Sequence, residues 1–197
     1  MTVRNTRVLL IAAAFVAGLV LCFGVIMLVN GRAPVAQQIA AIGGPFNLTD
    51  QNGRPLSDQD LKGRPFLVFF GFTHCPDVCP TTLFEVSEIM RALGPDADRT
   101  RALFITVDPE RDTPEVMKNY LSSFDPHLAG LTGDAAAIAA VAKAYRVYFK
   151  KVPLDQGGYT MDHTAIVYLM DKQGRFVAPF SLKRTTEAAA ADLRKYL

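Results

Sequence analysis

Beyond its first few residues, the sequence of 197 residues has no excess of basic over acidic residues or of acidic over basic ones. It contains 21 lysines and arginines against 19 aspartates and glutamates. Arg4 and Arg7 lie before the long apolar run, where there is no acidic residue, so the rest of the chain is formally neutral, with 19 basic residues (21 minus 2) against 19 acidic ones. This balance argues against nucleic acid or a strongly charged ligand as a partner. The sequence also has no internal repeat and no low-complexity tract, which excludes a repeat architecture.

Cysteine is scarce, with three residues in the whole chain. Cys22 lies in a long apolar run, where we expect inert packing. Only Cys75 and Cys79 remain for chemistry in the rest of the chain. A structural zinc site usually takes four protein ligands, and there is no third cysteine outside the apolar run to complete one. Zinc held by two cysteines, one histidine and water stays chemically allowed.

Charge is absent altogether from Val8 to Val29, a run of 22 residues. Such a run is long enough to cross a membrane as a helix. The basic residues before it predict that residues 1–7 form a cytoplasmic tail and that the rest is exported. The run is longer than a typical signal-peptide core and no clear cleavage site follows it, which favours an uncleaved anchor over a cleaved leader. The short tail leaves no room for an organelle transit peptide, so we expect a single-pass protein of a bacterial inner membrane with a periplasmic domain.

The 168 residues that follow the apolar run (197 minus 29) fall into a linker and one domain. Glycines and prolines among small residues predict a tether over residues 30–45. Residues 46–197 have the length and apolar content of one ordinary domain.

Cys75 and Cys79 lie where a strand is predicted to turn into a helix. Residues 66–70 form a short aromatic and β-branched run, typical of a buried strand, and apolar residues recur at helical spacing over about residues 81–93. Four residues make about one helical turn, so the two thiols share a face, about 6 Å apart between Cα atoms. This spacing suits a disulfide or a soft metal ion, and the helix N-terminus is expected to lower the thiol pKa values. The alternative is a pair of buried structural cysteines.

The remaining pattern predicts a mixed α/β domain. A strand, a helix, a second strand and a second helix are followed by a hairpin and a last helix, and another hairpin precedes them all. This is the layout of a thioredoxin-like fold with an added N-terminal hairpin. The further predicted elements are a hairpin at 46–61, strands at 102–107, 128–132, 164–169 and 175–178, and helices from Thr113-Pro114, at 134–145 and at 186–197.

Three motifs together carry a resemblance to a known family. They are Gly71-Phe72-Thr73-His74-Cys75-Pro76-Asp77-Val78-Cys79-Pro80, Thr106-Val107-Asp108-Pro109-Glu110-Arg111-Asp112-Thr113-Pro114, and Asp162-His163-Thr164. The combination closely resembles the Sco/SenC family of copper-binding assembly factors for cytochrome c oxidase, over essentially the whole exported domain. The resemblance implies copper ligands at Cys75, Cys79 and His163. Two thiolates and an imidazole suit copper on chemical grounds as well.

The resemblance also implies partners and a role. The expected role is that of a membrane-anchored copper chaperone, not an enzyme, which delivers copper to the dinuclear copper centre of the oxidase. The expected partners are the copper-bearing oxidase subunit and other copper chaperones as donors.

The other polar residues near the motifs have weaker claims. His74 adjoins Cys75, but neighbouring side chains at a strand end diverge. His127 has the setting of an ordinary surface-turn histidine. Asp77 and Asp162 adjoin proposed ligands, where they could orient the histidine or contact a partner, although Asp77 could instead stabilise a helix start. The acidic and basic residues of 108–112 are expected at the same end of the sheet as the thiols, as a partner contact or as a capped helix entrance.

Two enzymatic alternatives stay open at this point. Cys75 and Cys79 could form the redox pair of a thiol-disulfide oxidoreductase, although familiar enzymes of this fold have two intervening residues instead of three. A peroxide-reducing enzyme needs an activated thiolate with a basic partner, and no lysine or arginine adjoins Cys75 in sequence.

Overall fold

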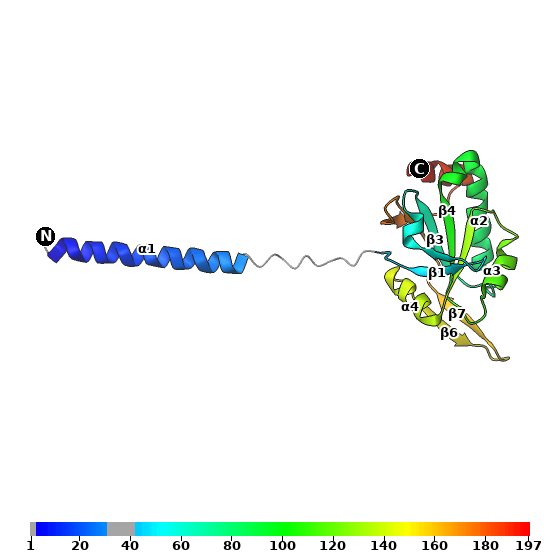
Figure 1. Cartoon of the computed structure of the whole chain (residues 1–197), viewed down its shortest axis with the longest axis horizontal. Coiled ribbons are helices and arrows are strands. Elements are labelled where there is room, and N and C mark those ends of the chain that lie inside the picture. Colours follow the sequence, from blue (N-terminus) through cyan, green and yellow to red (C-terminus); the bar gives the residue numbers. More distant parts are fainter. Residues whose placement is uncertain (1–2, 31–41) are drawn as a thin grey trace. The chain divides into compact units, whose positions relative to one another are not determined.

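The computed structural model describes residues 3–30 and 42–197, and the chain divides into two compact units, residues 1–40 and 41–197 (Figure 1). The first unit contains the helix α1 (Val3–Asn30), whose side chains are described at residues 13–25 and 27. No helix among the described residues is long and apolar enough to cross a membrane, so the anchor at residues 8–29 stays a prediction. Most of the predicted linker, residues 31–41, lies outside the described residues.

The second unit is a mixed α/β domain built on a seven-stranded sheet in the order β2-β1-β5-β4-β3-β8-β9. The three central strands run parallel, and the flanking strands are antiparallel to their neighbours. A separate two-stranded sheet pairs β6 with β7 (Figure 1). The strands are β1 (Asn47–Asp50), β2 (Pro55–Ser57), β3 (Phe66–Gly71), β4 (Arg101–Thr106), β5 (Leu128–Thr132), β6 (Phe149–Pro153), β7 (Tyr159–His163), β8 (Val167–Met170) and β9 (Phe176–Pro179). The helices are α2 (Val78–Leu93), α3 (Pro114–Leu121), α4 (Ala135–Ala144) and α5 (Thr186–Arg194), with short 3₁₀ turns η1 (Asp58–Leu61) and η2 (Gly94–Arg99).

Most predicted elements are confirmed close to their expected bounds, because strong local signals set them. All six residues of β3 are buried, as its apolar run predicts. The helix α3 begins with Pro114 after the cap Thr113, whose hydroxyl accepts a hydrogen bond from the Val116 amide at 3.3 Å. The helix α2 begins at Val78, earlier than expected, so Cys79 lies in its first turn.

The hairpin of β6 and β7 lies near the motifs and was not predicted from the sequence. Residues 149–153 and 159–163 pair in antiparallel register around a turn containing Gly157 and Gly158. Both glycines have positive φ angles, which the turn requires. His163, which directly precedes the strand predicted at 164–169, is the last residue of β7.

The two faces of β3 meet different layers of the domain. Phe69 stacks on Phe104 of β4, which in turn contacts Tyr120 of α3. Phe70 points to the opposite face, where its ring lies 5.4 Å from that of Tyr145, the residue that ends α4. Gly71 shares the first of these faces, and an added Cβ would lie 2.7 Å from the Cys79 sulfur. The absence of a side chain at Gly71 therefore lets α2 bring a thiol onto the end of β3.

We expect Gly71→Ala to reduce the free energy of unfolding by about 1–3 kcal/mol, because the new methyl group overpacks this contact. It would lie 2.6 Å from Cε2 of the Phe104 ring as well as against the Cys79 thiol. Denaturant unfolding measures the loss, and the rate of Cys79 alkylation reports the displaced thiol. Gly130→Ala is the control: its Cβ meets flexible ends of Leu121 and Met117 at 2.6 and 2.9 Å, so it should leave Cys79 alkylation unchanged. Unaltered stability and alkylation in Gly71→Ala would contradict this packing argument.

His127, expected to be an ordinary surface histidine, is held between two carboxylates just before β5. Its Nδ1 lies 2.7 Å from Asp125 Oδ1 and its Nε2 lies 3.1 Å from Asp98 Oδ1. Burial opposes the charged ring, but the hydrogen bonds and charges of the two aspartates outweigh it and raise the pKa of His127 above its ordinary 6.5.

His127→Gln should therefore lower stability more in acid than in base. A pKa raised in the folded state adds stability that is fully present below the unfolded pKa and is lost as pH rises through the folded pKa. We expect the variant to lose about 0.5–1 kcal/mol more at about pH 5 than at about pH 9, as measured by denaturant unfolding. Removing Asp98 by Asp98→Asn should shrink that difference, and a loss that does not vary with pH would contradict it.

Candidate metal centre

Cys75 and Cys79 lie at the junction of β3 and α2, as the sequence predicts. Cys75 is partly buried in the loop between them, whereas Cys79 is fully buried, with an exposed fraction of 0%. The Cys79 amide donates a hydrogen bond to the Cys75 sulfur at 3.4 Å. The Cys75 sulfur thus lies beside the first turn of α2, and Cys75 is the more exposed of the two cysteines.

Burial makes Cys79 a weak acid. Desolvation raises the pKa of its thiol well above the ordinary value of 9.0, and the neighbouring Cys75 and Asp112 add to the increase. A backbone hydrogen bond with Phe72 only partly opposes it. The expectation of a lowered pKa is therefore wrong for Cys79, because removal from water outweighs the helix N-terminus at this depth.

His163 reaches Cys79 from the end of β7. Its Nε2 lies 3.7 Å from the Cys79 sulfur, although 84 residues separate the two in sequence. Its Nδ1 lies 3.1 Å from the carbonyl oxygen of Thr164, an arrangement in which Nδ1 donates and Nε2 presents its lone pair to the thiol. The rings of Phe69 and Phe72 contact the imidazole edge-on at 6.3 and 5.8 Å between centroids. The imidazole is thus oriented by one carbonyl and two aromatic rings.

The distance between Cys79 and His163 fits shared coordination of one ion. Metal-to-sulfur and metal-to-nitrogen bonds of about 2.3 and 2.0 Å at a tetrahedral angle place the two donor atoms about 3.5 Å apart. Among the described residues, however, no group of three or more histidine, cysteine, aspartate or glutamate side chains is arranged to hold a metal. Two of the three expected ligands thus have suitable spacing.

Asp77 and Asp162 lie beside the site without contacting the histidine through any described hydrogen bond. Asp77 is the residue before α2, but its side chain does not cap the helix. Asp162 is exposed on β7 and helps to line a pocket of about 210 Å³ next to Cys75 and His163. The described partners of the His163 ring nitrogens are the Thr164 carbonyl and the Cys79 sulfur. A role for either aspartate in orienting the ligand or in docking stays a prediction.

The described contacts of His74 are with Thr73 and Asp112, not with the thiols. Its ring is about half exposed, and its Nδ1 lies 3.1 Å from the Thr73 hydroxyl and 3.9 Å from Asp112. His74 is therefore brought to the loop but not to the cysteines.

The segment 108–112 lies at the same end of the sheet as the thiols, as predicted, but it is built into the fold. Asp112 is fully buried and accepts hydrogen bonds from the Thr73 amide at 3.0 Å and from the Thr73 and Thr106 hydroxyls at 2.6 Å each. It therefore fastens the loop that carries Cys75 to the end of β4. The sequence does carry one indication that Asp112 holds this loop. The segment directly follows the buried strand β4, and this places Asp112 at the end of the sheet where the Cys75 loop lies.

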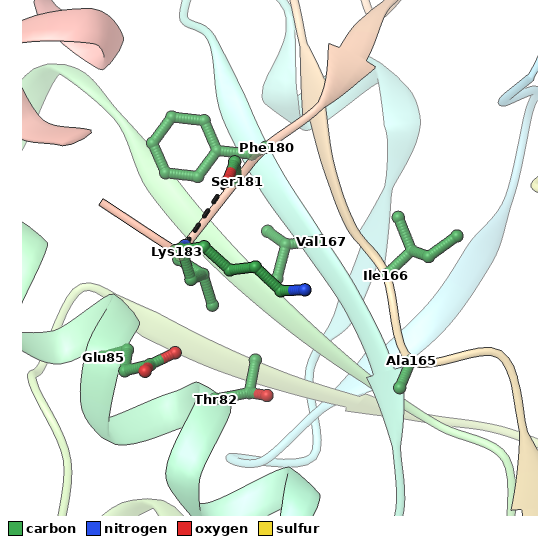
Figure 2. Close-up of a pocket in the computed structure, with 9 residues that line it drawn as sticks. Thr82, Glu85, Ala165, Ile166, Val167, Phe180, Ser181 and Lys183 are labelled. Atoms are coloured by element: carbon green, nitrogen blue, oxygen red, sulfur yellow. Dashed lines mark hydrogen bonds between the residues drawn. The ribbon is translucent and has the colours of Figure 1, made fainter.

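A second hollow adjoins the site and shares Ala165 with the pocket beside the thiols. It has a volume of about 420 Å³ and lies between α2 and the segments that flank the pairing of β8 with β9. Figure 2 shows Thr82 and Glu85 of α2 on one side and Lys183 on another. Val78, which is 47% exposed, lines the pocket beside the thiols, and Ile166, which is 39% exposed, lines the second hollow. The cysteine end of the domain is thus an open, partly apolar surface.

Comparisons with known proteins agree with this geometry. A family model described as SCO1/SenC matches residues 34–197. The solved structure of Bradyrhizobium japonicum ScoI with copper bound is 70% identical, with a TM-score of 0.78 over 80% of this chain and 100% of that chain. The SCO2-like protein RP587 of Rickettsia prowazekii is 37% identical over 90% of this chain and 91% of that protein. These likenesses extend over the whole second unit.

More distant and longer relatives set the limits of the comparison. BsSco, described as a member of the Sco family of cytochrome c oxidase assembly proteins with a disulfide switch, is 22% identical with a TM-score of 0.64 over 79% of this chain and 94% of that chain, which shows the fold alone. The chain spans 64%, 57% and 53% of the mitochondrial SCO2 homolog of cattle, SCO1 homolog of mouse and SCO2 of yeast. The expected thioredoxin-like α/β fold is confirmed for the second unit, and the chain belongs to the SCO1/SenC family.

Proposed function

We propose that this protein is a membrane-tethered copper chaperone that binds copper through Cys75, Cys79 and His163. It delivers the ion to the dinuclear copper centre of a cytochrome c oxidase subunit during assembly. The observation that carries the proposal is the 3.7 Å approach of His163 Nε2 to the Cys79 sulfur, with Cys75 one helical turn away.

Copper fits this donor set better than zinc. Thiolate sulfur and imidazole nitrogen are preferred by copper, and three ligands leave the ion open to a further donor. A structural zinc ion would usually take a fourth protein ligand, which the three proposed residues do not supply. The copper-bound ScoI structure, at 70% identity, supports the same choice.

Transfer to the client proceeds by exchange of ligands. A client thiolate displaces His163 first, because the histidine lies on a peripheral hairpin outside the seven-stranded sheet. Cys75, which is partly exposed, follows, and the fully buried Cys79 releases the ion last. Val78 and Ile166, the exposed apolar side chains beside Cys75 and His163, provide a surface on which the client docks.

The proposed setting is a bacterial inner membrane. The uncharged run of residues 8–29 anchors the chain, residues 1–7 stay in the cytoplasm, and a linker of residues 30–45 lets the copper-binding domain of residues 46–197 reach its client in the periplasm. Other copper chaperones act as donors.

A reductase is the second candidate, and the unequal burial of the two cysteines favours it as an accessory activity. The more exposed Cys75 thiolate attacks a client disulfide, which forms a mixed disulfide and releases one client thiolate. The Cys79 thiolate then attacks Cys75, which releases the second client thiolate and leaves a Cys75–Cys79 disulfide. The client gains the two electrons that the pair loses, so its cysteines become ready to accept copper.

Copper titration of the reduced full-length protein tests the proposal. We expect one tightly bound copper ion per chain, a loss of tight binding in Cys75→Ser and Cys79→Ser, and weaker binding with an altered thiolate-to-copper charge-transfer spectrum in His163→Ala. The loss in His163→Ala should exceed about tenfold, since even residues outside the ligand shell contribute about 10–100-fold.

His74→Ala is the matched control, because His74 adjoins Cys75 but points toward Thr73 and Asp112. It should leave affinity and spectrum unchanged. An unchanged affinity in His163→Ala would remove the histidine from the site, and the absence of tight copper binding in the wild type would favour the reductase.

A further inference from the structure

The hairpin that carries His163 stands outside the main sheet. Strands β6 and β7 pair only with each other, whereas the other seven strands form one sheet. A two-stranded hairpin by itself is at best marginally stable in water. Contacts elsewhere along the hairpin must therefore hold His163 at its distance from Cys79.

One compact set of contacts joins the start of β7 to the segment after β4. Arg111 donates from Nη1 to the carbonyl oxygen of Tyr159 at 3.0 Å, and its guanidinium carbon lies 3.8 Å from the centre of the Tyr159 ring. The Tyr159 hydroxyl donates to Asp108 Oδ1 at 2.9 Å, and Arg111 Nε donates to the other oxygen of the same carboxylate. The three side chains thus form a closed ring of interactions, which we call the Arg111 latch.

The Arg111 latch is largely withdrawn from water. Asp108 has an exposed fraction of 2%, and the side chain of Arg111 is 24% exposed. Breaking a buried charge pair by removing one member is costly, because the other charge is left without compensation. On the solvent side, Lys151 of β6 lies 4.2 Å from the Tyr159 ring centre and pairs with Glu110 at 2.7 Å. That outer pair is exposed and is expected to contribute little.

The segment that contains the Arg111 latch also holds the cysteine loop. Asp108 and Arg111 form hydrogen bonds with Tyr159 at the start of β7. Asp112, in the same segment, accepts a hydrogen bond from Thr73 in the loop that leads to Cys75. The two halves of the candidate metal centre, 84 residues apart between Cys79 and His163, are therefore fastened to one short piece of chain.

We propose that Arg111, Asp108 and Tyr159 are positioning residues that hold the β6–β7 hairpin so that His163 meets Cys79, and that release of the Arg111 latch withdraws the histidine. This inference rests on the proposed function of the site. Tyr159 and His163 are the two ends of β7, about 13 Å apart along an extended strand of five residues. The latch therefore controls the histidine from a distance and does not touch the metal.

The first test uses the metal-free, reduced full chain. Arg111→Met should speed amide hydrogen exchange of residues 160–163 by roughly tenfold or more, with little change in β3 and β4, because the hairpin opens as a local unit. It should also shift the NMR signals of the His163 ring, which lies edge-on to Phe72. Tyr159→Phe, which removes only the hydroxyl bonded to Asp108, should give smaller changes in the same direction.

Conservative and control variants separate positioning from general destabilisation. Arg111→Lys should restore part of the His163 signal position, since it keeps the charge beside Asp108. Arg175→Met removes a more exposed arginine–aspartate pair, in which Arg175 Nε donates to Asp171 at 2.8 Å in the turn between β8 and β9, and should leave the hairpin unchanged. In the copper-loaded protein, Arg111→Met should raise the copper dissociation rate by about tenfold and alter the charge-transfer spectrum in the direction of His163→Ala.

The inference is overturned if Arg111→Met leaves the exchange of residues 160–163 and the His163 signals unchanged. It is equally overturned if β3 and β4 exchange faster by the same factor, which would mean a purely global effect. If the wild type binds no copper, the proposed function fails, while the metal-free measurements still decide whether Arg111 positions His163.

Discussion

The buried carboxylate of Asp112 is the interaction on which the cysteine end of the domain depends. It has no exposure to water, and it accepts hydrogen bonds from the Thr73 amide and from the hydroxyls of Thr73 and Thr106. A buried carboxylate is tolerated only when its oxygens are satisfied, so these donors must lie where the structure places them. The loop to Cys75, the end of β4 and the start of α3 are thereby locked together.

The two cysteines occupy different environments although they lie four residues apart. Cys79 is sealed against Gly71 and the ring of Phe104, where water cannot stabilise its charge, whereas Cys75 reaches toward solvent. An ion that binds both thiols must replace the proton of the buried one, so metal capture at this site is coupled to proton release. Because Cys75 is more exposed than Cys79, another molecule would contact the Cys75 thiol first.

The fold could be predicted largely from local signals, and the site only in part. The buried run of β3, the cap at Thr113 with Pro114, and the turn between β8 and β9 each act over a few residues, which a sequence displays directly. The hairpin of β6 and β7 could not be predicted, because its residues do not alternate between buried apolar and exposed polar side chains. Strand β6 has the sequence Phe149-Lys150-Lys151-Val152-Pro153 and is mostly exposed. The approach of His163 to Cys79 came from the family resemblance, since no spacing rule joins residues 84 positions apart. The burial of the Cys79 thiol, which decides whether its pKa is raised or lowered, depends on tertiary packing and could not be predicted from the sequence.

The separation of the hairpin from the main sheet has a thermodynamic consequence. An ion bound jointly by Cys79 of α2 and His163 of β7 would connect the helix to a hairpin that shares no strand pairing with the main sheet. By reciprocity, whatever free energy the docked hairpin adds to ion binding, the bound ion adds to docking of the hairpin. The orientation of β6 and β7 would then report occupancy to any molecule that contacts their exposed side. The copper-bound and copper-free forms would then differ in the orientation of the β6–β7 hairpin as well as in the presence of the ion. A partner that contacts the hairpin could distinguish the two forms without contacting the ion.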